Sequence, residues 1–280
     1  MIDLERVAAF SFDSDGGTPA GVALLQDWID ETEMQAIAAE IGYSETVFAV
    51  ASGDQFEVRY FAPDSEVAFC GHATIGLGAV LAERFGNGVF AIETVAMTKL
   101  EILGVMEGDC WNAGFCSAPC EVRSLDVSAL TRTLEIFGLS TSDLDSRLNP
   151  TLASAGLDHL IVFLSERSRL RGLGYEFEHG LVLAKDMGVT TIAFANMQDQ
   201  STFHARNFFP IGGVYEDPAT GAAAAAMCGY LQQNGWPTDD TIQILQGEDM
   251  GQPCRIVATI PATLEGGAAI EGAVRRLKAV

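Results

Sequence analysis

Residues 69–85 read Phe-Cys-Gly-His-Ala-Thr-Ile-Gly-Leu-Gly-Ala-Val-Leu-Ala-Glu-Arg-Phe, and a second segment farther along the chain follows the same plan. That segment, residues 216–234, begins Glu-Asp-Pro-Ala-Thr-Gly and continues through five alanines into further apolar residues. Residues 73–82 and 218–231 contain no charged side chain. A helix that is apolar on every side is buried, and these runs are shorter than the roughly 20 residues that span a bilayer. The two segments therefore predict two interior helices.

The polar turns that precede the two predicted helices are candidate binding sites. The first N–H groups of a helix have no partner within the helix, and they lie at the positive end of its dipole. A helix N-terminus is therefore suited to bind an anion. We predict that the two helix N-termini face each other and hold one small carboxylate-bearing molecule between them.

The length and composition indicate a globular protein with two lobes. Apolar residues make up 48% of the 280 residues and charged residues 19%, which is typical of a chain with a large core. We expect an N-terminal lobe over residues 1–118 and a C-terminal lobe over residues 119–265. A strand at about residues 266–280 can return to the first lobe.

The charge and the amino terminus argue against two kinds of partner. The chain has 16 Lys and Arg against 38 Asp and Glu, which gives a formal charge of −22. Phosphate groups would be repelled, so we expect no nucleic-acid partner. The first residues lack the basic and apolar regions of a secretory signal, so we expect a cytoplasmic protein with no membrane partner.

The six cysteines fit a reducing compartment. Three of them form the one cluster in the sequence, Cys110, Cys116 and Cys120, and their spacing matches no common zinc pattern. Free cysteines in proteins are usually buried, so we interpret these three as structural thiols. We expect no metal ion in this protein.

Hydrophobic periodicity predicts a mixed α+β fold. Strands of the first lobe are expected at residues 4–12, 20–25, 43–50, 55–62, 88–94, 99–106 and 110–116. Strands of the second lobe are expected within residues 152–164 and at 189–195, 202–209, 241–247, 255–260 and 263–278. Amphipathic helices are expected at residues 31–41, 126–137 and 176–187, and residues 119–125 cross between the lobes.

Three polar side chains stand at positions that suit a binding site, and each has a structural alternative. Glu45 begins an apolar strand, where it is either solvated or a half-buried carboxylate able to exchange a proton with carbon. His72 lies at the start of the first interior helix, where it is either a structural group or a donor to a substrate. Asp217 precedes Pro218 and caps the second interior helix or contributes to the site.

Residues 13–18, Asp-Ser-Asp-Gly-Gly-Thr, come close to the Asp-x-Asp-Gly-Thr loop of phosphotransferases with an aspartate nucleophile. An additional glycine interrupts that pattern. Asp and Gly are also the usual residues of tight turns, which is the interpretation that we favour. The phosphotransferase alternative predicts magnesium-dependent phosphatase activity that requires Asp13.

The sequence resembles the phenazine-biosynthesis (PhzF-like) family of the diaminopimelate-epimerase fold along nearly its whole length. The similar segments are Gly17-Thr18-Pro19-Ala20-Gly21-Val22, Ser44-Glu45-Thr46, Arg59-Tyr60-Phe61-Ala62-Pro63, Glu66 with Cys70-Gly71-His72-Ala73-Thr74, His159-Leu160, Ala205-Arg206-Asn207-Phe208-Phe209-Pro210, Glu216-Asp217-Pro218-Ala219-Thr220-Gly221-Ala222, and Gln246-Gly247 with Met250-Gly251. Two long motifs in this order and at this separation are specific to the family.

The resemblance implies two similar lobes, each a strongly curved, mostly antiparallel sheet around a buried central helix, with the active site between the lobes. It implies an isomerase or epimerase that works without a metal or organic cofactor, and a homodimer. By this resemblance Glu45 is the general acid/base, and His72 and Asp217 are the flanking catalytic groups. The residues that would bind the substrate at the helix N-termini are Gly71, Ala73, Thr220, Gly221 and Ala222.

The sequence departs from the family pattern at three places. Ala222 stands where serine is common, Thr18 where asparagine is usual, and Gln252-Pro253-Cys254 where Arg-Pro-Ser is expected. Loss of a hydroxyl at position 222 removes one possible hydrogen bond to the substrate, worth about 0.5–1.5 kcal/mol. The departures bear on the identity of the substrate, and they leave open a protein of the same fold that binds a ligand without catalysis.

Related racemases and epimerases use two thiols, one in each lobe. Here Cys70 precedes Gly71-His72, but the matching segment of the second lobe has Asp217-Pro218 and no cysteine. A racemisation by two cysteines is therefore disfavoured.

Overall fold

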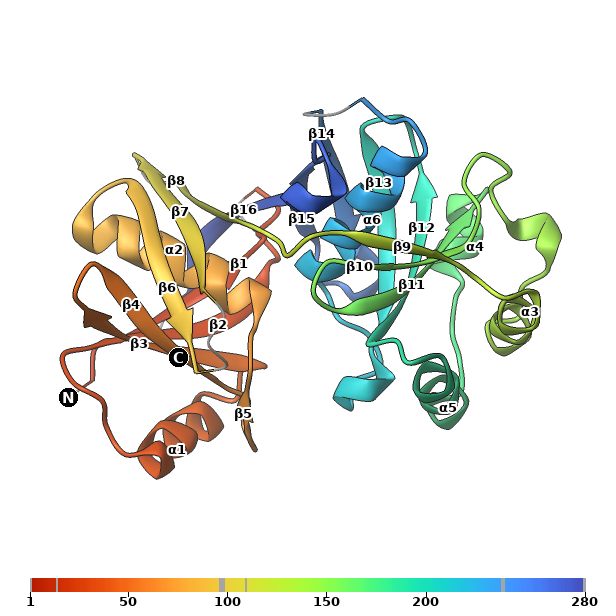
Figure 1. Cartoon of the computed structure of the whole chain (residues 1–280). Helices are drawn as coiled ribbons and strands as arrows, with labels where there is room; N and C mark the ends of the chain where they lie inside the picture. The colour runs from red at the N-terminus through yellow and green to blue at the C-terminus, as the bar shows by residue number, and fades with distance from the viewer. Residues whose placement is uncertain (1, 14, 96–98, 109, 238–239, 279–280) are drawn as a thin grey trace. The chain divides into compact units, whose positions relative to one another are not determined.

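A computed structural model of the chain describes residues 2–13, 15–95, 99–108, 110–237 and 240–278 (Figure 1). The chain divides into two compact units. The first unit comprises Met1–Cys116 and Glu271–Val280, and the second comprises Ser117–Ile270. The C-terminal segment therefore belongs to the first unit.

The first unit is a closed barrel of eight strands. The barrel strands are β1 (Leu4–Ala9), β2 (Thr18–Leu25), β3 (Glu45–Ser52), β4 (Gln55–Phe61), β6 (Gly88–Thr94), β7 (Lys99–Glu107), β8 (Cys110–Cys116) and β16 (Ala269–Arg276), and the unit has one further short strand, β5 (Glu66–Val67). The order around the barrel is β1-β2-β3-β4-β6-β7-β8-β16, and β1 pairs with β16 to close it, while the short β5 pairs with β4. The helices of this unit are α1 (Glu31–Ile41) and α2 (Gly71–Phe85).

Helix α2 is the predicted interior helix, and every residue from His72 to Ala82 is buried. Its glycines allow close contact with the barrel wall. A Cβ atom at Gly104 on β7 would lie only 2.2 Å from the backbone oxygen of Gly78 on α2. Strand and helix can therefore pack this closely only because position 104 has no side chain. The apolar surface of α2 and its small residues together explain why the sheet can wrap around it.

Helix α1 packs on the opposite face of the sheet. Its buried residues Met34 and Ala38 contact Ala23, Phe48 and Phe61, which point outward from three neighbouring strands. The helix ends at Gly42, which has the left-handed backbone conformation that glycine favours. The predicted bounds of this helix are confirmed.

The second unit repeats this arrangement. Its strands are β9 (Glu121–Ser124), β10 (Thr151–Ser154), β11 (Asp158–Leu164), β12 (Thr191–Met197), β13 (Thr202–Phe208), β14 (Thr241–Gln246) and β15 (Cys254–Thr259), in the order β15-β14-β13-β12-β11-β10-β9. Its helices are α3 (Val127–Ile136), α4 (Arg167–Arg171), α5 (Phe177–Met187) and α6 (Gly221–Gln233), with 3₁₀ turns η1 (Thr141–Asp143), η2 (Pro210–Gly212), η3 (Glu248–Met250) and η4 (Leu264–Gly266).

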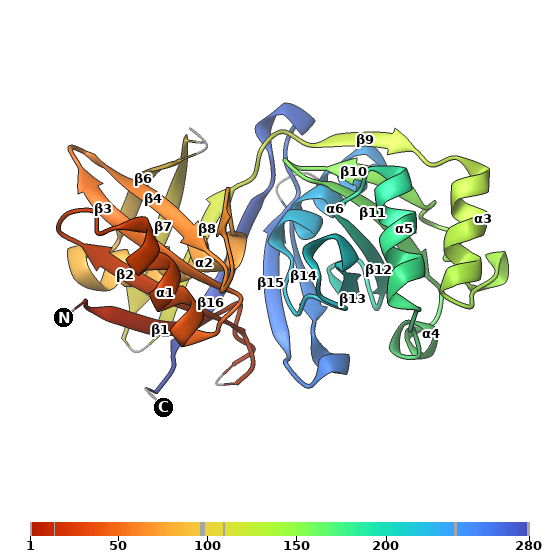
Figure 2. The same cartoon turned by 90° about the horizontal axis from the view of Figure 1, so that it is seen from below.

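Helix α6 is the second interior helix, with ten of its residues buried, while α3, α4 and α5 lie on the other face of the sheet (Figure 2). Leu170 on α4, Leu183 on α5 and Phe137, which follows α3, contribute to a core cluster with Phe194 and Phe208 from the strands. Each unit is therefore a curved α+β sheet with one helix inside and others outside, which confirms the predicted fold class.

The two units share one pattern of strand pairing. In the first unit β2 pairs with β3 in parallel across α1, and β4 pairs with β6 in parallel across α2. In the second unit β11 pairs with β12 in parallel across α4 and α5, and β13 pairs with β14 in parallel across α6. The pairs β3–β4 and β12–β13 are antiparallel. By this pairing, position 45 of the first unit corresponds to position 191 of the second, since each residue begins the strand that follows the outer helix.

Several predicted bounds are wrong at their ends. The first strand stops at Ala9 and not at residue 12, because Phe10 has a positive φ of 57° that extended backbone cannot accommodate. Phe12 and Asp15 then form a tight turn through two backbone hydrogen bonds, as the turn interpretation of this segment predicts; Ser14 lies outside the described residues. The last strand begins at Ala269 and not at residue 263.

The intervals 119–125 and 165–180 contain structure that the sequence did not indicate. Residues 121–124 form strand β9, which pairs with β10, and residues 167–171 form the short helix α4. None of the helices in the described part of the chain has the length and apolar character needed to cross a bilayer.

Candidate active site

Strand alternation places Glu45 on the inner face of the first barrel. Val47 pairs with Tyr60 across β3 and β4, and the Tyr60 hydroxyl forms a 2.7 Å hydrogen bond with Thr74 on α2. The face that carries Val47 is therefore the one that contains the helix. Glu45 is two residues earlier on the same strand, so it shares that face and points toward the start of α2.

Glu45 and His72 are in contact. The Oε2 atom of Glu45 lies 3.3 Å from Nε2 of His72, and the two side chains are 22% and 9% exposed. The hydroxyl of Ser44 lies 3.2 Å from the same nitrogen. A half-buried carboxylate is thus held beside an imidazole at the start of a buried helix. Ser44, which was not among the predicted site residues, is a third member of this group.

The start of α2 can contribute backbone donors to the group. Gly71 is the first residue of the helix, followed by His72 and Ala73, and the side chain of the preceding residue, Cys70, does not cap it. The first helical hydrogen bond runs from the Thr74 N–H to the Cys70 carbonyl oxygen at 3.0 Å. The N–H groups of positions 71 to 73 thus come before the first helical hydrogen bond, at the positive end of the dipole.

Cys70 adds a thiol to the group, and the donor atoms of Glu45, Cys70 and His72 lie within 4.8 Å of one another, a separation that a metal ion could bridge. The Cys70 sulfur is 3.3 Å from Nδ1 and 3.8 Å from Nε2 of His72. A sulfur nearly equidistant from both nitrogens lies beside the ring and not in front of either lone pair. A metal ion needs its ligands directed at one point, so this arrangement does not fit a metal site.

Among the other cysteines, Cys110 and Cys116 are exposed, which contradicts our interpretation of them as buried thiols. They are at the two ends of β8, at alternate positions that point away from the barrel interior. Cys120 and Cys228 are buried, and burial raises the pKa of both thiols, so neither is an activated nucleophile.

Asp217 does not cap the second interior helix, which was one of the two alternatives that the sequence left open. The second interior helix begins at Gly221 with Thr220 as the residue before it, so Asp217 does not cap it and Pro218 is not in its first turn. The Asp217 N–H instead donates to the Asn207 carbonyl oxygen at 2.9 Å, in an isolated bridge to β13. The carboxylate Oδ2 accepts a 2.5 Å hydrogen bond from the Thr220 hydroxyl. A backbone bridge, and not a helix cap, therefore holds this aspartate.

The remaining predicted residues of the second unit lie at the same helix start. Gly221 and Ala222 are the first two residues of α6, and Ala222 is partly exposed. The Thr220 side chain does not cap the helix because its hydroxyl is directed to Asp217. Within their own units, the structure brings Glu45 to His72 and Asp217 to Thr220. That one substrate contacts both groups stays a prediction.

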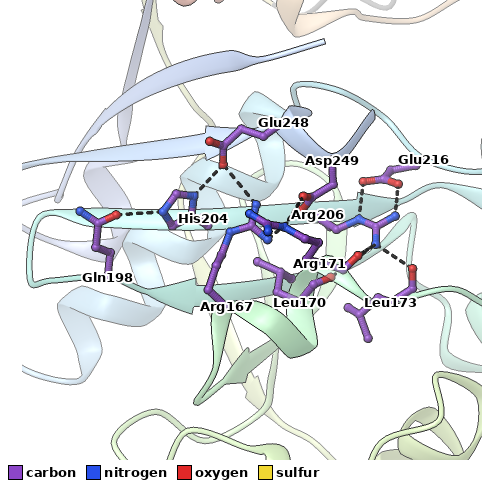
Figure 3. A network of polar contacts seen from close by, with 10 residues as sticks. All are labelled: Arg167, Leu170, Arg171, Leu173, Gln198, His204, Arg206, Glu216, Glu248 and Asp249. Carbon is purple, nitrogen blue, oxygen red and sulfur yellow. Dashed lines mark hydrogen bonds and ion pairs between the residues drawn. The ribbon is translucent and has the colours of Figure 1, made fainter. Parts of the chain in front are cut away.

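Each unit fixes the loop before its inner helix with the same ion pair. In the first unit Arg59 on β4 donates two hydrogen bonds to Glu66, at 2.7 and 2.6 Å. In the second, Arg206 on β13 donates two to Glu216, at 2.9 and 2.6 Å (Figure 3). The guanidinium groups also lie over Phe61 and Phe208, 5.2 and 5.0 Å from the ring centres. Because both glutamates precede a helix start, the pairs order the loops that carry the candidate site residues.

The Arg206 pair is the more deeply buried of the two, with 9% and 4% of the side chains exposed against 18% and 25%. Arg206 also donates to the carbonyl oxygens of Leu170, Arg171 and Leu173, where α4 ends (Figure 3). Burial opposes the charged form of Arg206, but the hydrogen bonds to Glu216 outweigh it, and its pKa is raised. Arg206 is therefore charged at neutral pH.

Solved structures with this fold define the class of protein. The chain superposes on the crystal structure of the Bacillus anthracis phenazine biosynthesis protein of the PhzF family with a TM-score of 0.85, 25% identity, and coverage of 99% of this chain and 97% of that one. It likewise matches a predicted epimerase from Pseudomonas aeruginosa with a TM-score of 0.83 and 21% identity, over 98% and 96% of the two chains.

Sequence comparison agrees with the structural match. The family described as phenazine biosynthesis-like protein matches residues 7–272, and this chain belongs to it. An uncharacterized isomerase from Deinococcus radiodurans is 33% identical over 243 residues, which cover 84% of this chain and 78% of the relative. The predicted resemblance is confirmed, and the relatives place the chain in a family of isomerase and epimerase type.

Proposed function

We propose that the protein is an isomerase that moves a proton between carbon atoms of a small carboxylate-bearing molecule, with Glu45 as the general acid and base. The observation that carries this proposal is the contact between Glu45 and His72 at the uncapped start of a buried helix. A carboxylate that is partly removed from water and held in position is suited to accept a proton, and Glu45 is 22% exposed and held beside His72.

The proposed reaction has two steps. Glu45 takes a proton from a carbon near the substrate carboxylate, which breaks the C–H bond and leaves the electron pair delocalised onto the neighbouring unsaturated or carboxylate group. The same residue then returns the proton to another carbon. His72 and the first N–H groups of α2 support the negative charge that forms in between. The net change is the position of one hydrogen, so no oxidant or reductant is required.

We propose further that Asp217, Thr220 and the start of α6 contact the same substrate, as the family resemblance implies. Asp217 would assist the proton transfer, and Gly221 and Ala222 would bind the substrate through their backbone. The proposal includes no metal or organic cofactor, as the family resemblance implies. A homodimer in the cytoplasm remains our expectation for this family member.

The test is carbon-bound hydrogen exchange in D₂O. The wild-type protein is incubated with a panel of small acids that carry a C–H bond next to a carboxylate or a double bond, and deuterium uptake is followed by NMR and mass spectrometry. We expect uptake with at least one acid, and its loss in Glu45→Gln, which retains the size of the side chain. Full exchange in Glu45→Gln would exclude Glu45 as the base.

The same panel tests the alternative of a protein that binds a ligand without catalysis, which the missing hydroxyl at Ala222 favours. In that case calorimetry detects binding of an acid, but no carbon-bound hydrogen exchanges. An Ala222→Ser variant provides the matched comparison, because it restores the hydroxyl that is common in the family and adds only one atom.

A further inference from the structure

A chain of buried hydrogen bonds crosses the inner face of the second unit and ends at Asp217. His159 on β11 contacts Thr191 on β12, with Nδ1 2.7 Å from the hydroxyl oxygen. The Thr191 hydroxyl donates to Asn207 Oδ1 on β13 at 2.8 Å, and Asn207 Nδ2 donates to Thr220 Oγ1 at 2.5 Å. The Thr220 hydroxyl then donates to Asp217 Oδ2. His159, Thr191 and Asn207 are all at most 2% exposed.

The direction of every bond in this chain follows from its last member. The Thr220 hydroxyl donates to Asp217 Oδ2, so its single hydrogen is used there. The Thr220 oxygen must then accept, and it does so from Asn207 Nδ2 and also from Gln246 Nε2 at 3.1 Å. With its amide nitrogen turned to Thr220, Asn207 presents its oxygen to Thr191. The donor and the acceptor of each hydrogen bond between Thr191 and Asp217 are therefore fixed.

The same argument fixes the tautomer of His159. Because the Thr191 hydroxyl hydrogen is used on Asn207, its oxygen must accept from His159, so Nδ1 carries the proton. The other ring nitrogen, Nε2, is buried and has no hydrogen-bond partner among the described residues. Burial lowers the pKa of His159 to about 3, which keeps the ring neutral.

A buried nitrogen without a hydrogen-bond partner lowers the stability of a protein, so His159 is a poor choice for stability alone. An apolar residue would fill the position on β11 without that cost. His159 instead supplies an N–H donor to the hydroxyl oxygen of Thr191 on the neighbouring strand. This bond is the first in the series of hydrogen bonds that ends at Asp217. This observation favours a role in the site over a role in the core.

We propose that His159 is a positioning residue for Asp217, acting through Thr191, Asn207 and Thr220. The Asn207 amide cannot reverse its direction without turning over, so the chain keeps Asp217 Oδ2 an acceptor and holds the carboxylate in one orientation. Asp217 would then exchange a proton with a substrate through its other carboxylate oxygen, Oδ1. The catalytic part of this inference rests on the proposed function, whereas the direction of the chain does not.

The direction of the chain is tested by NMR of protein labelled with ¹⁵N-histidine. The sequence has four histidines, and the His159 signals are assigned by their absence in His159→Asn. We expect neutral His159 with the proton on Nδ1 from pH 5 to pH 8. In Thr191→Val, which removes the hydroxyl and keeps the shape, we expect a mixture of tautomers, and in Thr191→Ser the wild-type tautomer. A wild-type His159 with its proton on Nε2 overturns the proposal.

The role in the site is tested by deuterium exchange with the wild-type protein, Thr191→Val and Thr191→Ser. We expect Thr191→Val to lower the exchange rate about tenfold, which is about 1.4 kcal/mol, and to change its pH profile, with Thr191→Ser restoring both. An unchanged rate and profile in Thr191→Val, together with a scrambled tautomer, refutes the positioning role. If wild-type protein exchanges hydrogen on no acid of the panel, the proposed function fails, yet the tautomer measurement still decides the direction of the chain.

Discussion

The Nε2 atom of His72 lies 3.3 Å from Oε2 of Glu45, although the residues are 27 positions apart and belong to a helix and a strand. The contact exists because β3 begins with an inward-facing side chain at the level of the first turn of α2. A shift of either residue to a neighbouring position in its strand or helix would break the contact.

This contact predicts how the site responds to changes at His72. We expect His72→Leu to lower the rate of deuterium exchange on the order of 10²-fold, because it removes a donor near the developing negative charge. Ser44→Ala should have a smaller effect, up to about tenfold, because it removes one hydrogen bond to the imidazole. The exchange assay measures both, and circular dichroism confirms folding. Wild-type exchange in His72→Leu would show that the imidazole does not support the reaction.

The two ion pairs predict unequal effects on stability. Arg206→Met leaves Glu216 buried without its partner, so we expect a loss of about 3–5 kcal/mol in the free energy of unfolding. Arg59→Met is the matched control at the corresponding position of the first unit, where the pair is more exposed, and we expect a loss of about 1 kcal/mol. Urea unfolding measures both. Equal losses would show that burial does not set the contribution of these pairs.

The contact between α2 and the barrel predicts that Gly104 tolerates no side chain. Its added Cβ would meet the Gly78 backbone oxygen at 2.2 Å and the Ala82 Cβ at 2.9 Å, and neither is a flexible group. Overpacking usually costs about 1–3 kcal/mol of stability where the neighbouring side chains can adjust. Here the neighbours cannot adjust, so we expect Gly104→Ala to lower the free energy of unfolding by more than this amount or to prevent folding. Gly88→Ala is the control, since Gly88 pairs with Gly104 in the sheet but has open space around its Cβ. Similar thermal unfolding of the two variants would contradict the predicted clash.

The neutral state of His159 predicts a pH dependence of stability. Its folded pKa of about 3 is below the value of 6.5 expected for the unfolded chain. Below pH 6.5 the unfolded state therefore binds a proton that the folded state does not, and stability falls as the pH decreases toward 3. The contribution is about 1.4 kcal/mol per pH unit. His159→Asn keeps an N–H donor but does not titrate, so we expect a shallower loss of stability between pH 6.5 and 4.5.

Urea unfolding at several pH values measures this difference. His179→Gln is a control, since His179 is an exposed histidine on α5. The prediction fails when His159→Asn and the wild-type protein lose stability in parallel over this range.

The sequence was sufficient for the features that depend on local pattern. The apolar runs around residues 73–82 and 218–231 predicted both inner helices, and the alternation of residues 55–62 predicted β4 nearly to its last residue. The motif around Glu45 and His72 identified two side chains that are in contact. These predictions hold because burial of an apolar helix and strand periodicity are dictated by neighbouring residues.

Features that depend on pairing between distant strands could not be predicted. Asp217 looked like a helix cap because it precedes Pro218, but its backbone pairs with Asn207 and the helix begins four residues later. Thr191 gave no signal at all, since a threonine at the start of a strand is ordinary. Only the pairing shows that it occupies the position corresponding to Glu45. A usable signal was the repeated Arg-x-Phe-x-Pro pattern of residues 59–63 and 206–210, which marks both ion pairs.

The absence of free space between Gly78 and Gly104 has a consequence for inhibitor design. A helix in direct backbone contact with its barrel cannot slide or rotate, so His72 on its first turn is presented to every ligand in the same way. Little protein ordering entropy is then lost when a ligand binds there. Compact, rigid acids should accordingly gain more affinity at this position than flexible ones of equal size.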